Sequence, residues 1–294
     1  MTVNFAVLWL PPDFNRIRLA VDRGPKVRTD AKGGSMSQID VPLLATGFGQ
    51  TRRADNWWVQ PLVVFLGLSA FVVYSTWAAL QGQHFRFGPY LSPFYSPELF
   101  GPAHKGWFGP NPSWMPAWVT GAVLILWAPG GFRVTCYYYR GAYYKAFWAD
   151  PPSCTVGEPR KTYLGERSFP LIVQNVHRYF LYLALVFLVI LARDVWDAFW
   201  FDGRFGIGVG TLVLLTNLVL LSSYTTGCHS FRHLIGGFRD RLEGAPARKR
   251  VYDCVSCLNR RHMLFAWCSL CSVAFSDLYV RMCSMGIWTD WRIV

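Results

Sequence analysis

The segment TTGCHSFRHLIGG, residues 225–237, gathers a thiol, two imidazoles and a guanidinium at the end of a long apolar run: Cys228, His229, Arg232 and His233. Thiolate and imidazole together are ligands for zinc and for Rieske-type iron–sulfur clusters, and two imidazoles can ligate a haem iron. His229 and His233 are four residues apart, so a helix would place them one turn apart on the same face. The segment therefore predicts part of a metal, cluster or haem site.

The composition indicates which solvent surrounds this segment. Hydrophobic residues make up 52% of the 294 residues and charged residues 16%, whereas an ordinary soluble domain has about 25% charged residues. A chain in lipid must satisfy its backbone groups within each crossing, which a helix does. The sequence therefore predicts an all-α fold, a polytopic membrane helical bundle.

Five stretches are long and apolar enough, or nearly so, to cross a bilayer, which takes about 20 residues in a helix. They are residues 62–80, 114–132, 176–195, 207–224 and 263–287. The fifth contains Asp277 and Arg281, which lie four apart and so share one helical face. Charges at this depth are costly, so the pair is predicted to face protein, water or an interface.

Basic residues predict the orientation, because Lys and Arg concentrate in cytoplasmic segments. They cluster before the first stretch, between the second and third, and between the fourth and fifth. The N-terminus is therefore predicted to be cytoplasmic. The formal net charge of +12 then lies mainly on a cytoplasmic surface, which could attract anionic membrane lipid or dock an acidic soluble subunit. No nucleic-acid-binding motif accompanies the charge.

Two parts of the chain are predicted from this pattern. Residues 1–56 form a cytoplasmic N-terminal segment, whose first 35 residues are expected to be disordered or to precede a true start at Met36. Residues 57–294 form a five-helix membrane domain.

This topology brings distant residues to one depth. Cys136 follows the second stretch, His177 begins the third, and Cys228, His229 and His233 end the fourth, all at the predicted cytoplasmic edge. Each residue alone has an ordinary structural explanation, since a free Cys is usually a small buried hydrophobe. Together they allow three interpretations: structural zinc, a Rieske-type [2Fe–2S] cluster, or a haem held by His177 and His233.

Four segments then carry a family resemblance: TTGCHSFRHLIGG, CYYYRGAYYKAFWADPPSC, QNVHRYFLYLAL and YLSPFYSPELF. Together they resemble the membrane-anchor subunit of actinobacterial-type succinate dehydrogenase, respiratory complex II, over roughly residue 57 to the C-terminus. The resemblance implies a multi-pass plasma-membrane subunit bound to flavoprotein and iron–sulfur subunits. It also implies a Rieske-type [2Fe–2S] cluster, in place of haem b, that passes electrons to a membrane quinone, expected to be menaquinone.

Residue by residue, the resemblance implies the cluster ligands Cys136, His177, Cys228 and His233. The choice between His229 and His233 is narrow, because a regular helix turns both away from Cys228. The remaining His229, with Arg232, is then expected to hydrogen-bond the quinone.

The chain has neither a glycine-rich dinucleotide fingerprint nor a ferredoxin-like run of four cysteines. Succinate oxidation is therefore expected in the partner subunits, with no catalytic residue in this chain. Two alternatives stay open: a haem b quinone oxidoreductase anchor, and a non-redox membrane protein with structural zinc.

Overall fold

The computed structural model describes residues 47–51, 53–101, 106–153, 155–157, 168, 171–237, 241–242 and 244–294. The predictions for the first 35 residues and for a start at Met36 lie outside this part of the chain. The following sections concern the described residues.

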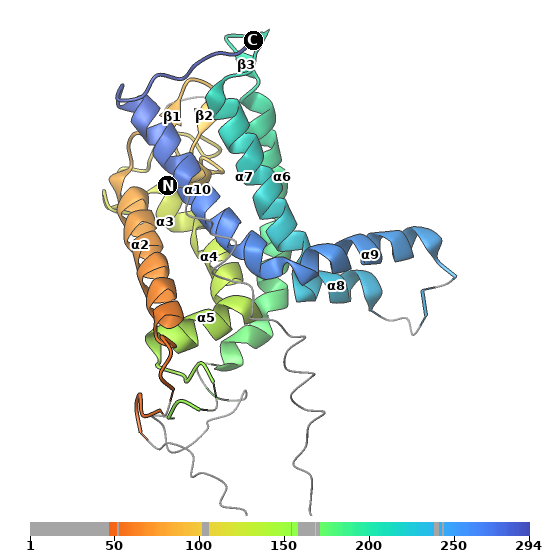
Figure 1. The fold of residues 1–294 in the computed structure, drawn as a ribbon. Coiled ribbons are helices and arrows are strands. Elements are labelled where there is room, and N and C mark those ends of the chain that lie inside the picture. The colour runs from red at the N-terminus through yellow and green to blue at the C-terminus, as the bar shows by residue number, and fades with distance from the viewer. Residues whose placement is uncertain are drawn as a thin grey trace, which may run out of the picture. The chain divides into compact units, whose positions relative to one another are not determined.

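Four long helices form a bundle (Figure 1): α2 Val59–Gln81, α6 His177–Asp197, α7 Val209–Thr226 and α10 His262–Ser284. All four are long and apolar enough to cross a membrane, α6 together with the short 3-10 helix η3 (Leu171–Val176) before it. Four of the five predicted crossings are thus confirmed as long apolar helices. The shortest, α7, has 18 residues, which gives a length of about 27 Å against a hydrocarbon core of about 30 Å.

The predicted crossing at residues 114–132 differs, because it is not one helix. It contains α3 (Gly121–Ile125) and α4 (Trp127–Val134), which follow each other along the bundle, and irregular backbone precedes α3. Pro129 explains the break: it has no backbone N–H to donate to Ile125, so the helical ladder is interrupted at the junction. This break lets the end of α4 depart from the line of a continuous helix.

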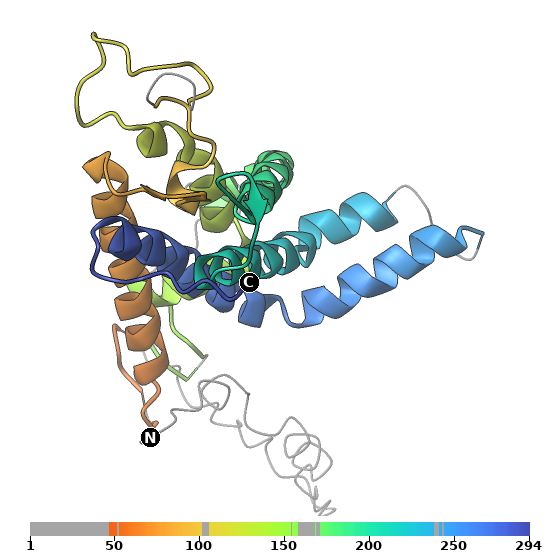
Figure 2. The same ribbon diagram turned by 90° about the horizontal axis from the view of Figure 1, so that it is seen from above.

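Three further helices gather at one end of the bundle, here called the α5 end. They are α5 (Tyr137–Phe147), α8 (His229–Gly236) and α9 (Pro246–Arg260). Helices α8 and α9 form a hairpin that projects sideways from the bundle (Figures 1 and 2). The chain therefore turns sharply where α4 meets α5 and where α7 meets α8.

The opposite end, here called the strand end, carries two small antiparallel pairs of strands. Strand β1 (Arg86–Phe87) pairs with β2 (Tyr90–Leu91), and β3 (Trp200–Phe201) pairs with β4 (Arg204–Phe205). The 3-10 helix η2 (Pro93–Tyr95) follows β2 and packs against α2, α3 and α10. The short link between α6 and α7 is thus a hairpin at this end.

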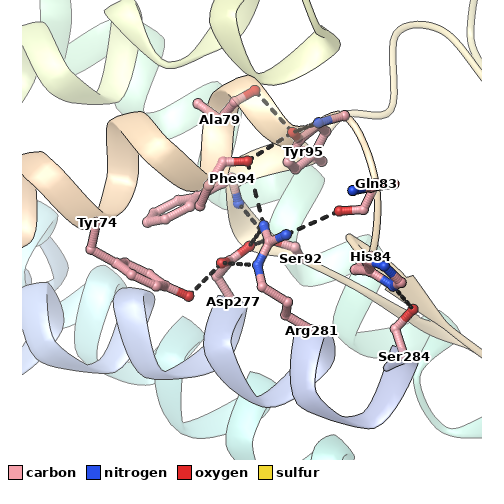
Figure 3. A network of polar contacts seen from close by, with 12 residues as sticks. Tyr74, Ala79, Gln83, His84, Ser92, Phe94, Tyr95, Asp277, Arg281 and Ser284 are labelled. Carbon is pink, nitrogen blue, oxygen red and sulfur yellow. Dashed lines mark hydrogen bonds and ion pairs between the residues drawn. The ribbon is translucent and has the colours of Figure 1, made fainter. Parts of the chain in front are cut away.

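Asp277 and Arg281 of α10 are buried in protein near the strand end (Figure 3). Protein is one of the environments predicted for them. Arg281 Nε donates to Asp277 Oδ2 at 3.3 Å, and Arg281 Nη1 donates to the Gln83 carbonyl at 3.0 Å. Asp277 also accepts hydrogen bonds from Tyr74 and Ser92. The carboxylate and the guanidinium therefore have several partners each, as buried charges require.

Candidate functional site

At the α5 end, a buried cluster joins the ends of several helices. Its members are Phe132, Cys136, Tyr139, Leu181, Ala184, Tyr224, Cys228 and Ala266. Cys136 is the N-cap of α5 and Cys228 is the N-cap of α8, with nearly the same extended backbone: φ −66° and ψ 133° for Cys136, φ −67° and ψ 145° for Cys228. Both thiols thus lie at sharp bends between helices.

His177, the first residue of α6, contacts Cys228 directly. Its Nε2 lies 3.1 Å from Cys228 Sγ, and its Nδ1 lies 2.8 Å from Thr135 Oγ1. The Thr135 hydroxyl donates its proton to the Gly131 carbonyl at 2.7 Å, so it accepts from Nδ1–H. This assignment leaves the Nε2 lone pair facing the thiol, which is how a ligand imidazole is oriented by its second nitrogen.

The Cys228 thiol is buried, and burial is the main cause that raises its pKa, with nearby Cys136 adding to the effect. The backbone N–H of Ser230 donates to Cys228 Sγ at 3.2 Å. A protonated thiol can donate to the free His177 Nε2. Metal binding would then displace this proton, since the thiolate is the ligand form.

His262, the first residue of α10, forms the second contact of this kind. Its Nε2 lies 3.4 Å from Cys136 Sγ. Its Nδ1 is buried and has no hydrogen-bond partner among the described residues. The sequence reasoning missed His262, because it started the fifth crossing one residue later. A signal was present, since His262 opens its helix as His177 opens α6.

Stacked rings hold both imidazoles. Phe132 stacks on His177 with ring centroids 4.7 Å apart, and Tyr224 stacks on His262 at 4.9 Å. Phe132 and Tyr224 meet edge to face at 5.5 Å. These two rings pack beside the imidazoles.

His233 lies elsewhere in the structure. Its Nε2 is 3.0 Å from the Nε2 of His229, on the exposed side of α8. The structure brings Cys136, His177 and Cys228 together as predicted but does not bring His233 to them. The sequence supported His233 only narrowly, and the turn between α7, which ends at Thr226, and α8, which begins at His229, leaves His233 on the exposed side of α8.

The predicted quinone residues His229 and Arg232 are both on α8. The Arg232 guanidinium lies 5.0 Å from the ring centroid of Tyr252 in α9. Partial burial is the main cause that lowers the pKa of His229, and the nearby charges of His233 and Arg232 lower it further. Arg232 thus packs against α9, while His229 pairs with His233 on α8.

The four donors Cys136, His177, Cys228 and His262 form two Cys–His pairs. No group of three or more His, Cys, Asp or Glu side chains among the described residues is placed to hold one metal ion. A Rieske-type [2Fe–2S] cluster takes two Cys ligands on one iron and two His ligands on the other. The donor set of a Rieske-type cluster matches the two thiols and two imidazoles present here. One of the imidazoles, His262, has a buried Nδ1 without a partner among the described residues.

Comparison with known proteins gives the family. Residues 59–286 match the family model described as actinobacterial succinate dehydrogenase subunit SdhC. This chain belongs to that family. A solved structure, the Mycobacterium smegmatis Sdh1 complex in the apo form, matches with 39% identity and a TM-score of 0.79, covering 88% of this chain and 98% of that one. No curated protein matches the chain.

The SdhC match includes every residue of the two Cys–His pairs and both helices of the projecting hairpin. Membership confirms the predicted class: a multi-pass membrane subunit of succinate dehydrogenase. The long helices agree with this class, since four of them are apolar enough to cross a membrane. The SdhC-family chain thus supplies membrane helices, and its buried thiols and imidazoles lie at one end of them.

Proposed function

We propose that this chain anchors succinate dehydrogenase in the plasma membrane and conducts electrons to quinone through a Rieske-type [2Fe–2S] cluster. One observation carries the proposal: two buried thiols each contact one imidazole, and the four side chains come from the starts of four helices. Ionisable side chains that gather at such a depth are functional candidates by default.

The ligands we propose are Cys136, Cys228, His177 and His262. His262 replaces His233 in this set, because His262 Nε2 is 3.4 Å from Cys136 Sγ while His233 is paired with His229. When bound, such a cluster supplies one-electron transfer, at potentials of about −150 to +300 mV in Rieske centres.

Neighbouring residues of this chain would orient the ligands and tune the site. Thr135 holds His177 with Nε2 free, and the Ser230 N–H donates to Cys228 Sγ. Hydrogen bonds to a ligand sulfur stabilise the extra negative charge of the reduced state, so the Ser230 contact raises the potential. Phe132 and Tyr224 exclude water from the imidazoles.

The α5 end would face the cytoplasm, where the flavoprotein and iron–sulfur subunits dock. Support comes from the predicted excess of basic residues on this side and from the matching Sdh1 complex. The overall reaction balances, because succinate oxidation to fumarate releases two electrons and two protons, and reduction of quinone to quinol takes up the same numbers. The sequence places quinone at His229 and Arg232, and that placement stays a prediction.

Low-temperature EPR of the purified complex, with analysis of iron and acid-labile sulfide, tests the proposal. His262→Ala should abolish the rhombic signal of the reduced Rieske-type cluster and stop quinone reduction, while succinate oxidation by a soluble dye continues. His233→Ala is the matched control and should keep the signal. Loss of the signal in His233→Ala with its retention in His262→Ala would refute the ligand set, and zinc without extra iron would refute the cluster.

A further inference from the structure

Helices α8 and α9 form a hairpin that is held together by its own contacts. At its base, Asn259 Nδ2 of α9 donates to the carbonyl of Gly227, the residue that ends α7, at 2.8 Å. At its tip, Arg248 Nη2 donates to the Gly237 carbonyl at 2.8 Å, just after α8. Because both ends are fixed, the outer surface of the hairpin has a defined pattern of side chains.

Helix α9 divides into faces when its residues are placed at 100° per position. Val255 is buried and marks the face that packs against the rest of the chain. The flank next to it is apolar: Val251 is 47% exposed, Cys254 is exposed and Leu258 is half-buried. An apolar strip on this helix therefore lies open.

An arginine strip borders the apolar flank on the side away from Val255. Arg250 and Arg261 are three helical turns apart, so they lie on one line along α9 and its C-terminal end. Both are exposed, and no carboxylate of the described residues forms an ion pair with either. Lys249, on another face, is paired with Asp253 at 2.9 Å. Two unneutralised cations thus lie beside the apolar flank.

The position of the hairpin is that of the membrane surface. It joins α7 to α10 at the α5 end, and both of these helices are long and apolar enough to cross a membrane. Helices α8 and α9 run across the direction of α6 and α7 in Figure 1, and they extend away from the other helices in Figure 2. The 15 residues of α9 give a length of about 22 Å. Helix α9 therefore extends over the lipid beside the bundle.

The ligand that fits this surface has an anionic head and an apolar tail. Amphipathic helices with basic and apolar faces lie at the boundary between head groups and acyl chains. A guanidinium binds phosphate with two parallel hydrogen bonds, while its aliphatic stem lies along apolar surface. We propose that the α8–α9 hairpin is an interfacial element that binds anionic phospholipid. Its apolar flank contacts the acyl chains, and Arg250 and Arg261 bind the lipid phosphates.

This lipid site is independent of electron transfer. It requires that the helices of the bundle cross the membrane, and it does not require the cluster. A complex without a Rieske-type EPR signal would therefore refute the proposed cluster and leave the lipid site to be decided by its own experiments.

Hydrogen exchange of the assembled complex in nanodiscs is the first test. Exchange in α9 should be slower in phosphatidylcholine mixed with phosphatidylglycerol than in phosphatidylcholine alone, because a ligand of the folded helix suppresses its opening. Arg250→Gln should reduce this slowing about fivefold, the factor that one basic residue contributes near an anionic surface. Equal exchange of wild-type α9 in the two lipids would overturn the proposal.

Arg204→Gln is the matched control for the exchange experiment. Arg204 is also exposed and has no ion pair with a carboxylate of the described residues, but it lies in β4 at the strand end. This variant loses the same charge and should keep the wild-type slowing in α9. An equal reduction in Arg204→Gln and Arg250→Gln would show an effect of net charge and overturn the assignment to α9.

Two exposed thiols of α9 measure its depth. Cys254 lies on the apolar flank, whereas Cys257 lies on the arginine strip. Each is labelled with a fluorophore in a variant in which the other is replaced by Ser, with Cys268→Ser and Cys271→Ser in both. Lipids that carry a spin label on the acyl chain should quench the label on Cys254 more strongly than the label on Cys257. Equal quenching, or none at either position, would overturn the proposed orientation.

A partner subunit on the hairpin is the competing outcome. A benzophenone attached to Cys257 in the single-thiol variant should cross-link to phosphatidylglycerol. Cross-links confined to the flavoprotein or the iron–sulfur subunit, and unchanged by the lipid composition, would show that the hairpin docks protein and would overturn the proposal.

Discussion

The ring of Tyr224 lies nearly parallel to the imidazole of His262, with planes 14° apart and centroids separated by 4.9 Å. Tyr224 is almost completely buried, and its hydroxyl has no hydrogen-bond partner among the described residues. The aromatic ring, and not the hydroxyl, therefore positions His262. This contact joins α7 to the first residue of α10, and it connects a buried side chain of the bundle with a proposed cluster ligand.

Replacing Tyr224 should distinguish its ring from its hydroxyl. Tyr224→Ala removes a large buried side chain, which should cost about 3–5 kcal/mol of stability, the range found for large aromatic residues in cores. We expect this variant to lose iron together with thermal stability. Tyr224→Phe keeps the stack and should retain iron. Iron content and thermal unfolding of the purified complex measure both effects, and loss of iron in Tyr224→Phe would show that the hydroxyl is needed.

Thr135 should control the strength of iron binding through His177. Thr135→Val removes the acceptor of the Nδ1–H bond while keeping the shape of the side chain. Loss of such an outer partner typically weakens metal binding by about 10–100-fold. Iron retained during timed exposure to a chelator is the measurement. Thr135→Ser restores the hydroxyl and should return retention to the wild-type level; equal retention in all three proteins would contradict the assignment of the His177 tautomer.

The buried ion pair of Asp277 and Arg281 at the strand end should affect stability without affecting the proposed cluster. Asp277→Leu leaves Arg281 buried and unpaired, which should cost about 3–5 kcal/mol. Tyr74→Phe removes one hydrogen bond to the same carboxylate and should cost about 1.5–3 kcal/mol, the range for a hydrogen bond to a charged group. Thermal unfolding in detergent ranks the two variants. The EPR signal of correctly folded protein should match the wild type in both, since Cys136 and Cys228 lie at the other end of the bundle.

The projecting hairpin should be more stable at neutral than at acidic pH. The lowered pKa of His229 means that the unfolded hairpin binds more protons than the folded one. This stabilisation is complete above the unfolded His pKa of about 6.5 and is lost as the pH falls through it. Hydrogen exchange of α8, corrected for its intrinsic pH dependence, should be faster at pH 5 than at pH 8. The same difference in His229→Gln would refute the role of His229.

Much of the fold was predictable because hydrophobic length alone defines a membrane crossing. The apolar runs that became α2, α6, α7 and α10 needed no tertiary information. The run at residues 114–132 was predicted as one helix but is broken into α3 and α4. Pro129 interrupts the helical hydrogen bonds, and average hydrophobicity contains no information about a missing N–H. The family resemblance and the predicted class agree with the comparisons.

The site was predictable only in part. The proximity of Cys136, His177 and Cys228 was predictable because topology brings the ends of consecutive helices to one depth. His262 was missed because its partner Cys136 is 126 residues away, and such a pair depends on where each helix begins. The choice between His229 and His233 was narrow because the direction of the chain after Cys228 depends on the bend between Thr226 and His229, and that bend depends on packing that periodicity does not describe.

The shared N-cap position of Cys136 and Cys228 has a consequence for biogenesis. Each cysteine is the joint between a helix that follows the bundle and a helix that turns away from this direction, so each sulfur is located by the angle at which the two helices meet. A chain in which α5 or α8 has not yet turned outward holds its two sulfurs apart. Retention of iron would therefore act as a quality check on assembly, favouring chains in which both joints have reached their final angle.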